Sequence, residues 1–164
     1  MKKSRRQLAI QRTVQITKAL IWVIGIIFIG IEAREVFGLR QFTHIAFFAI
    51  TLALASYQIA SSDTLYAHSK KLSAKAYQSS LTMYLASILS ALDAALDQAI
   101  ADFIGDLGIN FLLIPVFVLS WLLTSSAAII AIRSLCSFLD IFPVALAAKQ
   151  EWGFSNPDQD NAHQ

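Results

Sequence analysis

The chain of 164 residues has little of what disulfide scaffolds, cysteine-based zinc sites and soluble surfaces require. Its only cysteine, Cys136, excludes an intramolecular disulfide and any zinc site built on cysteine pairs. Charged residues make up only 15% of the chain, against about 25% in soluble domains. Hydrophobic residues make up 56% and the mean hydropathy is +0.58, which is more apolar surface than a soluble domain of this size can bury. We therefore expect one small integral membrane domain.

The motifs of common membrane enzymes are also missing. The sequence contains no P-loop, no glycine-rich dinucleotide turn and no His/Cys metal cluster. The histidines are His44, His68 and His163, and no serine in a glycine-framed motif accompanies them, as a rhomboid-like protease requires. The segment 103–106, Phe-Ile-Gly-Asp, lacks the first glycine of the Gly-x-Gly-Asp motif of intramembrane aspartyl proteases. The pairs Asp93 with Asp97 and Asp102 with Asp106 also lack the glycine and arginine motifs of membrane phosphotransferases. We expect no catalysis, no cofactor and no bound metal.

Basic residues are concentrated in residues 1–13, and no acid precedes Glu32. A cleaved signal peptide fits poorly because Glu-Ala-Arg-Glu follows the first apolar run. A mitochondrial transit peptide or a nucleic-acid-binding tail would also be basic and poor in acids. The positive-inside rule offers a simpler interpretation, in which residues 1–13 are a cytoplasmic N-terminus. We expect a multi-pass protein of a bacterial inner membrane that does not bind nucleic acid.

Four apolar segments are long enough, or nearly so, to cross a bilayer. They are residues 14–31, 42–60, 81–104 and 111–132, within a helical bundle that we expect to cover 14–148. The expected fold is therefore all-α, with four transmembrane helices and both termini in the cytoplasm.

The segments that join and follow these spans support that topology. The loop 61–79 is net basic and should be cytoplasmic, whereas the acidic region that starts at Asp93 contains no lysine or arginine before the fourth span. Residues 134–148 are apolar but short and are interrupted by Asp140 and Pro143, so we expect an interfacial helix or a re-entrant element there. Residues 149–164 are polar and should form a disordered tail.

Small and polar residues repeat at i, i+4, i+7 and i+11 on three of the spans. Small residues on one face allow helices to pack closely in a bilayer. We interpret these stripes mainly as packing faces of a compact bundle or a homo-oligomer. The stripes are Ala49, Ala53, Ser56 and Ala60 in the second span, Ala86, Ser90, Asp93 and Asp97 in the third, and Ser120, Thr124, Ala127 and Ala131 in the fourth.

The carboxylates of the third span raise a question of depth. If this helix enters the bilayer at Leu81, Asp93 lies roughly 18 Å along it, past the middle of a core of about 30 Å. An ionisable group there is costly and usually functional. Alternatively, the helix begins near Ala76, or the acids belong to an amphipathic outer segment. Asp102 and Asp106 favour the outer segment because they occupy the face opposite Asp93.

We therefore expect interfacial, solvated acids, with Asp97 at the interface and Asp93, beside Ser90, as the one candidate inside the bilayer. No basic residue in the outer halves of the other spans is an obvious counter-ion, and the nearest candidates are Arg34 and Arg40 in the first outer loop. His44 lies near the outer end of the second span, and we interpret it as an interfacial residue rather than a ligand or a proton relay.

Two functions fit this sequence. The first is a non-catalytic membrane protein that acts through helix–helix contacts, as an accessory, immunity or exclusion protein or as a subunit of a complex. The alternative is a small oligomeric channel, transporter or membrane-permeabilising protein whose path is lined by Ser90, Asp93 and Asp97. The expected partners are the lipid bilayer, a second copy or another membrane protein, and a small ion for the alternative.

Overall fold

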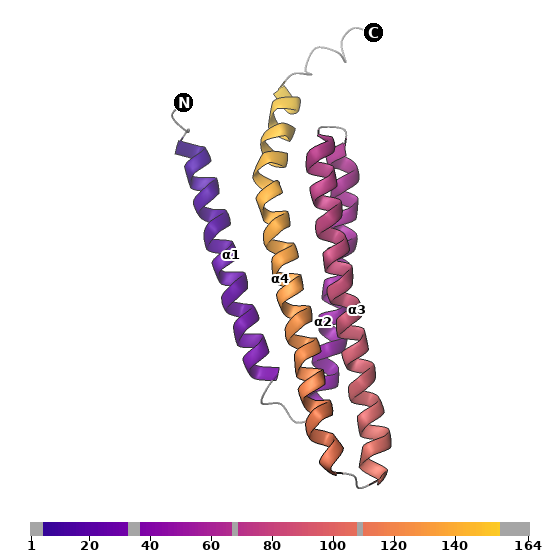
Figure 1. Cartoon of the computed structure of the whole chain (residues 1–164). Coiled ribbons are helices and arrows are strands. Elements are labelled where there is room, and N and C mark those ends of the chain that lie inside the picture. The colour runs from indigo at the N-terminus through magenta and orange to yellow at the C-terminus, as the bar shows by residue number, and fades with distance from the viewer. Residues whose placement is uncertain (1–4, 33–36, 67–68, 108–109, 155–164) are drawn as a thin grey trace.

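A computed structural model describes residues 5–32, 37–66, 69–107 and 110–154, and it is all-helical apart from the connection at Ser69 (Figure 1). The helices are α1 (Arg5–Glu32), α2 (Phe37–Tyr66), α3 (Lys70–Leu107) and α4 (Asn110–Phe154). They run alternately up and down, so that α1 begins, α2 meets α3 and α4 ends at the same end of the molecule.

Each helix contains a segment long and apolar enough to cross a membrane. The prediction of an all-α protein with four such helices is therefore confirmed, and it indicates an integral membrane protein. The segments are Leu8–Gly30, Thr43–Tyr66, Lys70–Gln98 and Pro115–Ile141.

The expected loop 61–79 is almost entirely helical, which corrects the sequence-based prediction. Neither glycine nor proline occurs between Gly38 and Gly105, so no residue in this region breaks a helix. The connection is short and contains Ser69, whose amide donates to the carbonyl of Leu65. The Ser69 carbonyl accepts from the amides of Leu72 and Ser73 and so begins α3.

The separate interfacial or re-entrant element expected at 134–148 is also not observed, because α4 passes through this segment without a break. Pro143 removes one backbone donor, but contacts on its N-terminal side hold the helix in place. Phe138 and Ile141 pack with Leu65 and Ala76 of the neighbouring helices. α4 then continues to Phe154, into residues that we expected to be disordered.

Helices α2, α3 and α4 pack through faces that repeat every seven residues, as in left-handed coiled coils. Small side chains occupy many of these positions and allow close approach, as membrane helices require. Among the described side chains, buried polar residues outnumber buried apolar ones. The buried heptad positions include His44, Thr51, Gln58 and Leu65 on α2, Ala76, Met83, Ser90 and Asp97 with Ser79, Ala86 and Asp93 on α3, and Ser120, Ala127, Ser134 and Ile141 with Thr124, Ala131 and Phe138 on α4.

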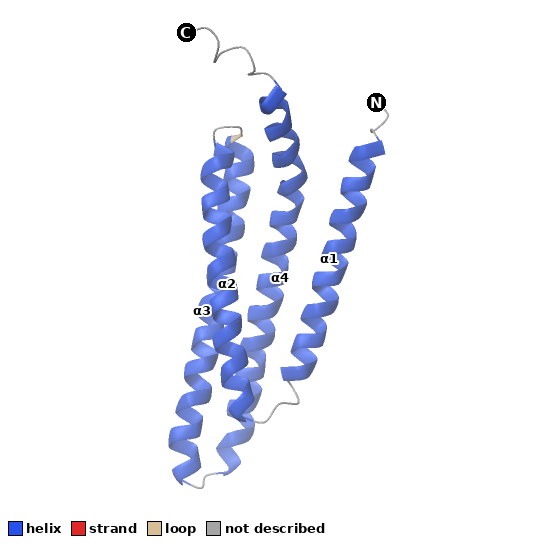
Figure 2. Cartoon of the chain, turned by 180° about the vertical axis from the view of Figure 1, so that it is seen from behind, coloured by secondary structure: helices blue, strands red, loops and turns tan. Residues whose placement is uncertain are grey.

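Helix α1 is peripheral and lies beside α4, on the side away from the α2–α3 pair (Figure 2). Lys18 forms an ion pair with Asp140 at 2.5 Å. Gly25 allows α1 to approach α4 closely, since a Cβ atom there would lie 2.1 Å from the Cδ1 atom of Ile132. An apolar cavity of about 430 Å³, lined by residues such as Phe28, remains between α1 and the other helices.

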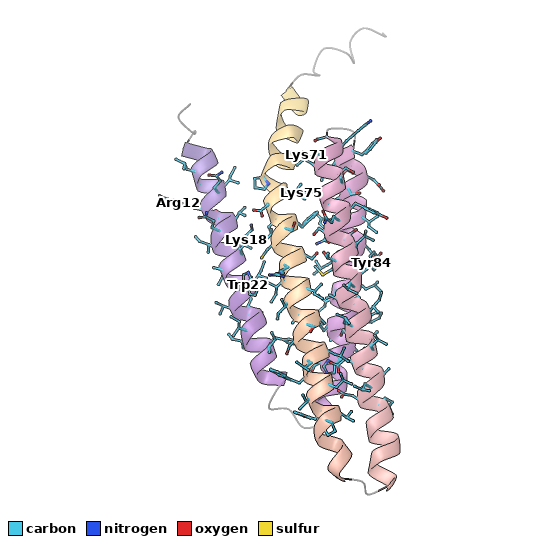
Figure 3. The ribbon with its side chains drawn as sticks, in the orientation of Figure 1. Arg12, Lys18, Trp22, Lys71, Lys75 and Tyr84 are labelled. Atoms are coloured by element: carbon cyan, nitrogen blue, oxygen red, sulfur yellow. The ribbon has the colours of Figure 1, made fainter. Side chains whose placement is uncertain are left out.

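Basic side chains mark the end of the bundle at which α1 begins. Figure 3 shows Arg12, Lys71 and Lys75 toward this end, on α1 and α3. The α3 acids Asp93 and Asp97 lie farther along the same helix, toward the opposite end. Among the described side chains, these basic residues and the two buried acids therefore lie toward opposite ends of the bundle.

Candidate functional site

Asp93 and Asp97 on α3 form the centre of a buried polar cluster. Both carboxylates face the interior, where Asp93 is 0% exposed and Asp97 is 4% exposed. Their i, i+4 spacing places them one turn apart on the same face. The helix continues past Asp97 to Leu107, a further ~15 Å at about 1.5 Å per residue, so neither acid lies at a helix end.

Helix α2 contributes His44, which is only 1% exposed. Its Nδ1 atom lies 3.4 Å from Oδ2 of Asp93, and its Nε2 atom lies 3.2 Å from Oδ2 of Asp97. The imidazole ring therefore lies between the two carboxylates and turns a different nitrogen toward each. The contact of Nε2 with Asp97 is a charge contact without hydrogen-bond geometry, and an imidazolium would suit two acidic neighbours.

Helix α4 contributes two hydroxyl groups to the same cluster. The Ser120 Oγ atom lies 2.5 Å from Oδ1 of Asp93 and 3.0 Å from Oδ1 of Asp97. Thr124 hydrogen-bonds through Oγ1 to Oδ2 of Asp93. Both hydroxyls are buried, and the two carboxylates thus have hydrogen-bond or ionic contacts to both flanking helices.

Ser90 positions the histidine through the backbone. Its hydroxyl, one turn before Asp93, donates to the carbonyl oxygen of His44 at 3.0 Å. This bond fixes α2 against α3 at the level of the cluster. Ser90 therefore acts on the cluster through the backbone of the helix that carries the histidine.

Two more buried polar levels follow toward the basic end of the bundle. Thr51 accepts a hydrogen bond from Ser87 at 2.9 Å, one heptad along α2 from His44, or about 10 Å. One heptad farther, the Ser134 hydroxyl lies 2.6 Å from the Ser79 carbonyl and 3.4 Å from Oε1 of Gln58. Polar groups thus recur along the α2–α3–α4 interface from the cluster toward the basic end of the bundle.

The structure brings together some of the residues chosen from sequence and separates others. Ser90, Asp93 and Asp97 are buried beside α2 and α4. The solvated position expected for Asp97 is wrong, since the carboxylate is enclosed by His44 and Ser120, whereas its interfacial depth stays a prediction. The α4 stripe, Ser120, Thr124, Ala127 and Ala131, is buried inside the bundle. The side chains of Asp102 and Asp106 lie outside those that the structure describes.

The stripe predicted on α2 does not pack inside the bundle. Ala49, Ala53, Ser56 and Ala60 lie outside the buried face of this helix, and all four are exposed. The physical reason is the cost of placing polar groups in lipid. Alanine can face lipid without cost, whereas a histidine, threonine or glutamine must find a hydrogen-bond partner inside the bundle. The face with His44, Thr51 and Gln58 therefore turns inward.

Sequence reasoning missed His44 as the partner of the acids, because a single histidine near the end of a span is usually interfacial. The sequence did contain a sign of burial, which is the spacing of the polar residues. His44, Thr51 and Gln58 follow each other at intervals of seven residues within an apolar span. Three polar residues on one face of a membrane helix indicate that this face is buried.

The cluster also has the donor types of a metal site. His44, Asp93 and Asp97 each offer a ligand atom, and these atoms lie within 4.8 Å of one another. Donors around a tetrahedral zinc ion stand closer, about 3.4 Å apart. The two short contacts of His44 use different ring nitrogens, and an ion bound to the ring would take one of them.

No family model, curated protein or solved structure matched the chain. Its function is therefore inferred from the geometry of the cluster and from the bundle around it.

Proposed function

We propose that this protein is a small, non-catalytic, multi-pass protein of a bacterial inner membrane that moves a small cation across that membrane. The path begins at the cluster of His44, Asp93 and Asp97, with Ser120 and Thr124 beside it. The observation that carries this proposal is the burial of three ionisable side chains between membrane-length helices.

Packing alone does not require such a cluster. The other levels of the same interface are joined by alanines and by hydroxyl pairs such as Ser87 and Thr51. Removing a carboxylate or an imidazolium from water costs several kcal/mol per ion. Ionisable groups inside membrane bundles most often mark ion paths or proton relays.

The distribution of charge supports a direction for this path. By the positive-inside rule, the basic end of the bundle faces the cytoplasm, together with both termini. Eighteen residues separate Lys75 from Asp93, which is about 27 Å of helix, so the cluster lies near the outer boundary of a core of about 30 Å. A cation would enter at the cluster and continue inward past Thr51 and Ser134.

Reconstitution into proteoliposomes tests this function. The wild-type protein should carry a cation current under an imposed gradient, and Asp93→Asn should abolish it while insertion and abundance stay normal. Asp63→Asn, which alters an exposed acid on α2, is the matched control and should keep wild-type flux. Unchanged flux in Asp93→Asn would contradict the proposal.

A second function has support from the outer face of α2. Ala49, Ala53, Ser56 and Ala60 form a smooth stripe outside the buried face of the single chain. Such a stripe suits close contact with another membrane helix. It would serve an accessory, immunity or exclusion protein, or a subunit that joins a larger complex or its own copies.

Crosslinking distinguishes the possible neighbours. A photo-crosslinking residue at Ala53 in native membranes should trap a specific adduct, whereas one at the exposed Leu92 of α3 should not. An adduct with a different protein supports an accessory subunit, and a self-adduct supports an oligomer. If Ala53 and Leu92 gave the same background, this second function would be refuted.

A further inference from the structure

We propose that the apolar cavity beside α1 binds one acyl chain of a membrane phospholipid. The cavity lies between α1 and the other three helices, and its volume is about 430 Å³. This inference is independent of the proposed cation transport, because it uses none of the residues of the polar cluster. Three features carry it: the chemistry of the lining, the dimensions of the cavity and the sparse packing of α1.

The lining of the cavity suits a hydrocarbon and offers little to a polar ligand. Isoleucine, leucine, phenylalanine and alanine side chains form most of it. Thr51 is a polar residue of the wall, but its hydroxyl already bonds to the Phe47 carbonyl and to the Ser87 hydroxyl, each at 2.9 Å. Apolar cavities of about 150 Å³ stay dry and bind molecules such as benzene. This larger cavity should therefore hold an apolar molecule rather than water.

The position of the cavity identifies lipid as the source of that molecule. All of its lining residues belong to the four membrane-length segments. Two of them, Ile24 of α1 and Ile50 of α2, are 64% and 58% exposed, so the cavity opens between these helices. In a bilayer, the molecules beside such an opening are lipids, whose acyl chains are as apolar as leucine. An acyl chain can therefore enter from the side without crossing a polar region.

The cavity is long and narrow, as a single chain requires. On α2 its lining extends from Thr43 to Leu54, which is about 16 Å of helix. That is about half of a bilayer core of about 30 Å, the depth of one leaflet. A volume of about 430 Å³ over this length gives a mean cross-section of about 27 Å², or a width of about 6 Å.

This width decides between an acyl chain and a helix of a second copy. A row of methylene groups is about 4 Å wide, as the contact distance between carbon atoms shows. An α-helix with its side chains is about 10–12 Å wide. The cavity therefore accommodates the hydrocarbon chain and excludes the helix.

Helix α1 has few protein contacts around the cavity. Among its described residues only Gly25 is buried, at the point where α1 meets α4. Phe28 stacks on Phe47 of α2 with ring centroids 5.3 Å apart, and Lys18 pairs with Asp140 of α4. These contacts fix α1 at separate points and leave the cavity beside it. A chain in the cavity would supply the dispersion contacts that α1 lacks there.

Lipid retention after purification tests this proposal. Protein purified in a mild detergent and analysed by native mass spectrometry should carry one phospholipid per chain. Ala46→Phe places a ring in the cavity and should lower the retained lipid at least fivefold. Ala46→Leu adds less volume and should lower it at least twofold. The matched control is Ala95→Phe, at an exposed alanine of α3 outside the lining, which should retain lipid as the wild type does.

Photo-crosslinking locates the chain, with circular dichroism and gel filtration confirming that each variant is folded. A phospholipid with a diazirine on one acyl chain, added at one per protein chain, should label Phe47 of the lining in preference to the exposed Leu92 of α3. Equal labelling of the two residues would overturn the proposal. So would a wild type without phospholipid, or with a detergent molecule or a second copy in its place. Wild-type retention in folded Ala46→Phe and Ala46→Leu would overturn it as well.

Discussion

Replacing His44 by leucine should destabilise the bundle through the two carboxylates that it leaves behind. The ring is 1% exposed and contacts both acids, so water cannot take its place. Removing one partner of a buried ionic group typically costs about 3–5 kcal/mol. We expect His44→Leu to lower the free energy of unfolding by about 3–4 kcal/mol.

The assay is reversible unfolding in mixed detergent micelles, followed by circular dichroism. His44→Leu is compared with the triple variant that adds Asp93→Asn and Asp97→Asn, which should recover most of the loss because no buried charge remains uncompensated. Gln58→Leu is the matched control, since it lies two heptads along the same buried face and its hydrogen-bond partner is the uncharged Ser134. It should cost about 1 kcal/mol.

The comparison tests whether the effects of the histidine and aspartate replacements on the free energy of unfolding depend on each other. The size of any single loss does not decide it. If the losses from His44→Leu and from the two aspartate replacements simply add, the histidine does not compensate the carboxylates. The same conclusion would follow if His44→Leu cost no more than Gln58→Leu. Either result would refute the account of the cluster as an ionic unit.

Two further predictions concern the bundle. Ala86→Leu should lower the free energy of unfolding by about 1–3 kcal/mol in the same assay, because Ala86 is fully buried. Ala49→Leu on the exposed face of α2 should lower it little. If Ala49→Leu cost as much as Ala86→Leu, the wrong face of α2 would have been assigned to the interior. In a Cys136→Ala background, cysteines at Asp106 and Lys71 should be labelled from the periplasm and the cytoplasm respectively, and the reverse pattern would invert the topology.

Composition and apolar length were enough to predict the helical class and four helices of membrane length. They did not locate the helix ends. The α2–α3 segment is polar, yet without proline or glycine the helices continue through it until Ser69 begins α3. Likewise, Pro143 suggested a break, but contacts of Phe138 and Ile141 with the neighbouring helices hold α4 together.

The helical spacing placed Ser90, Asp93 and Asp97 on one face, but sequence alone could not say which helix covers that face. Two faces of α2 carry suitable spacings, and small residues favoured the one that proves to lie outside the bundle. The inward face was set by the polar groups of His44, Thr51 and Gln58, whose need for partners in the bilayer outweighs the packing advantage of alanine. The burial of Asp93 and Asp97 inside the bundle followed from that choice.

The protonation state of His44 tests the central claim most directly. Nitrogen-15 spectra of histidine-labelled protein in bilayers, with His68→Gln and His163→Gln so that only His44 reports, resolve its two ring nitrogens. At pH 7 both nitrogens should carry a proton, as an imidazolium between two acidic groups requires. A neutral ring with a single protonated nitrogen would contradict the account of the cluster as an ionic unit.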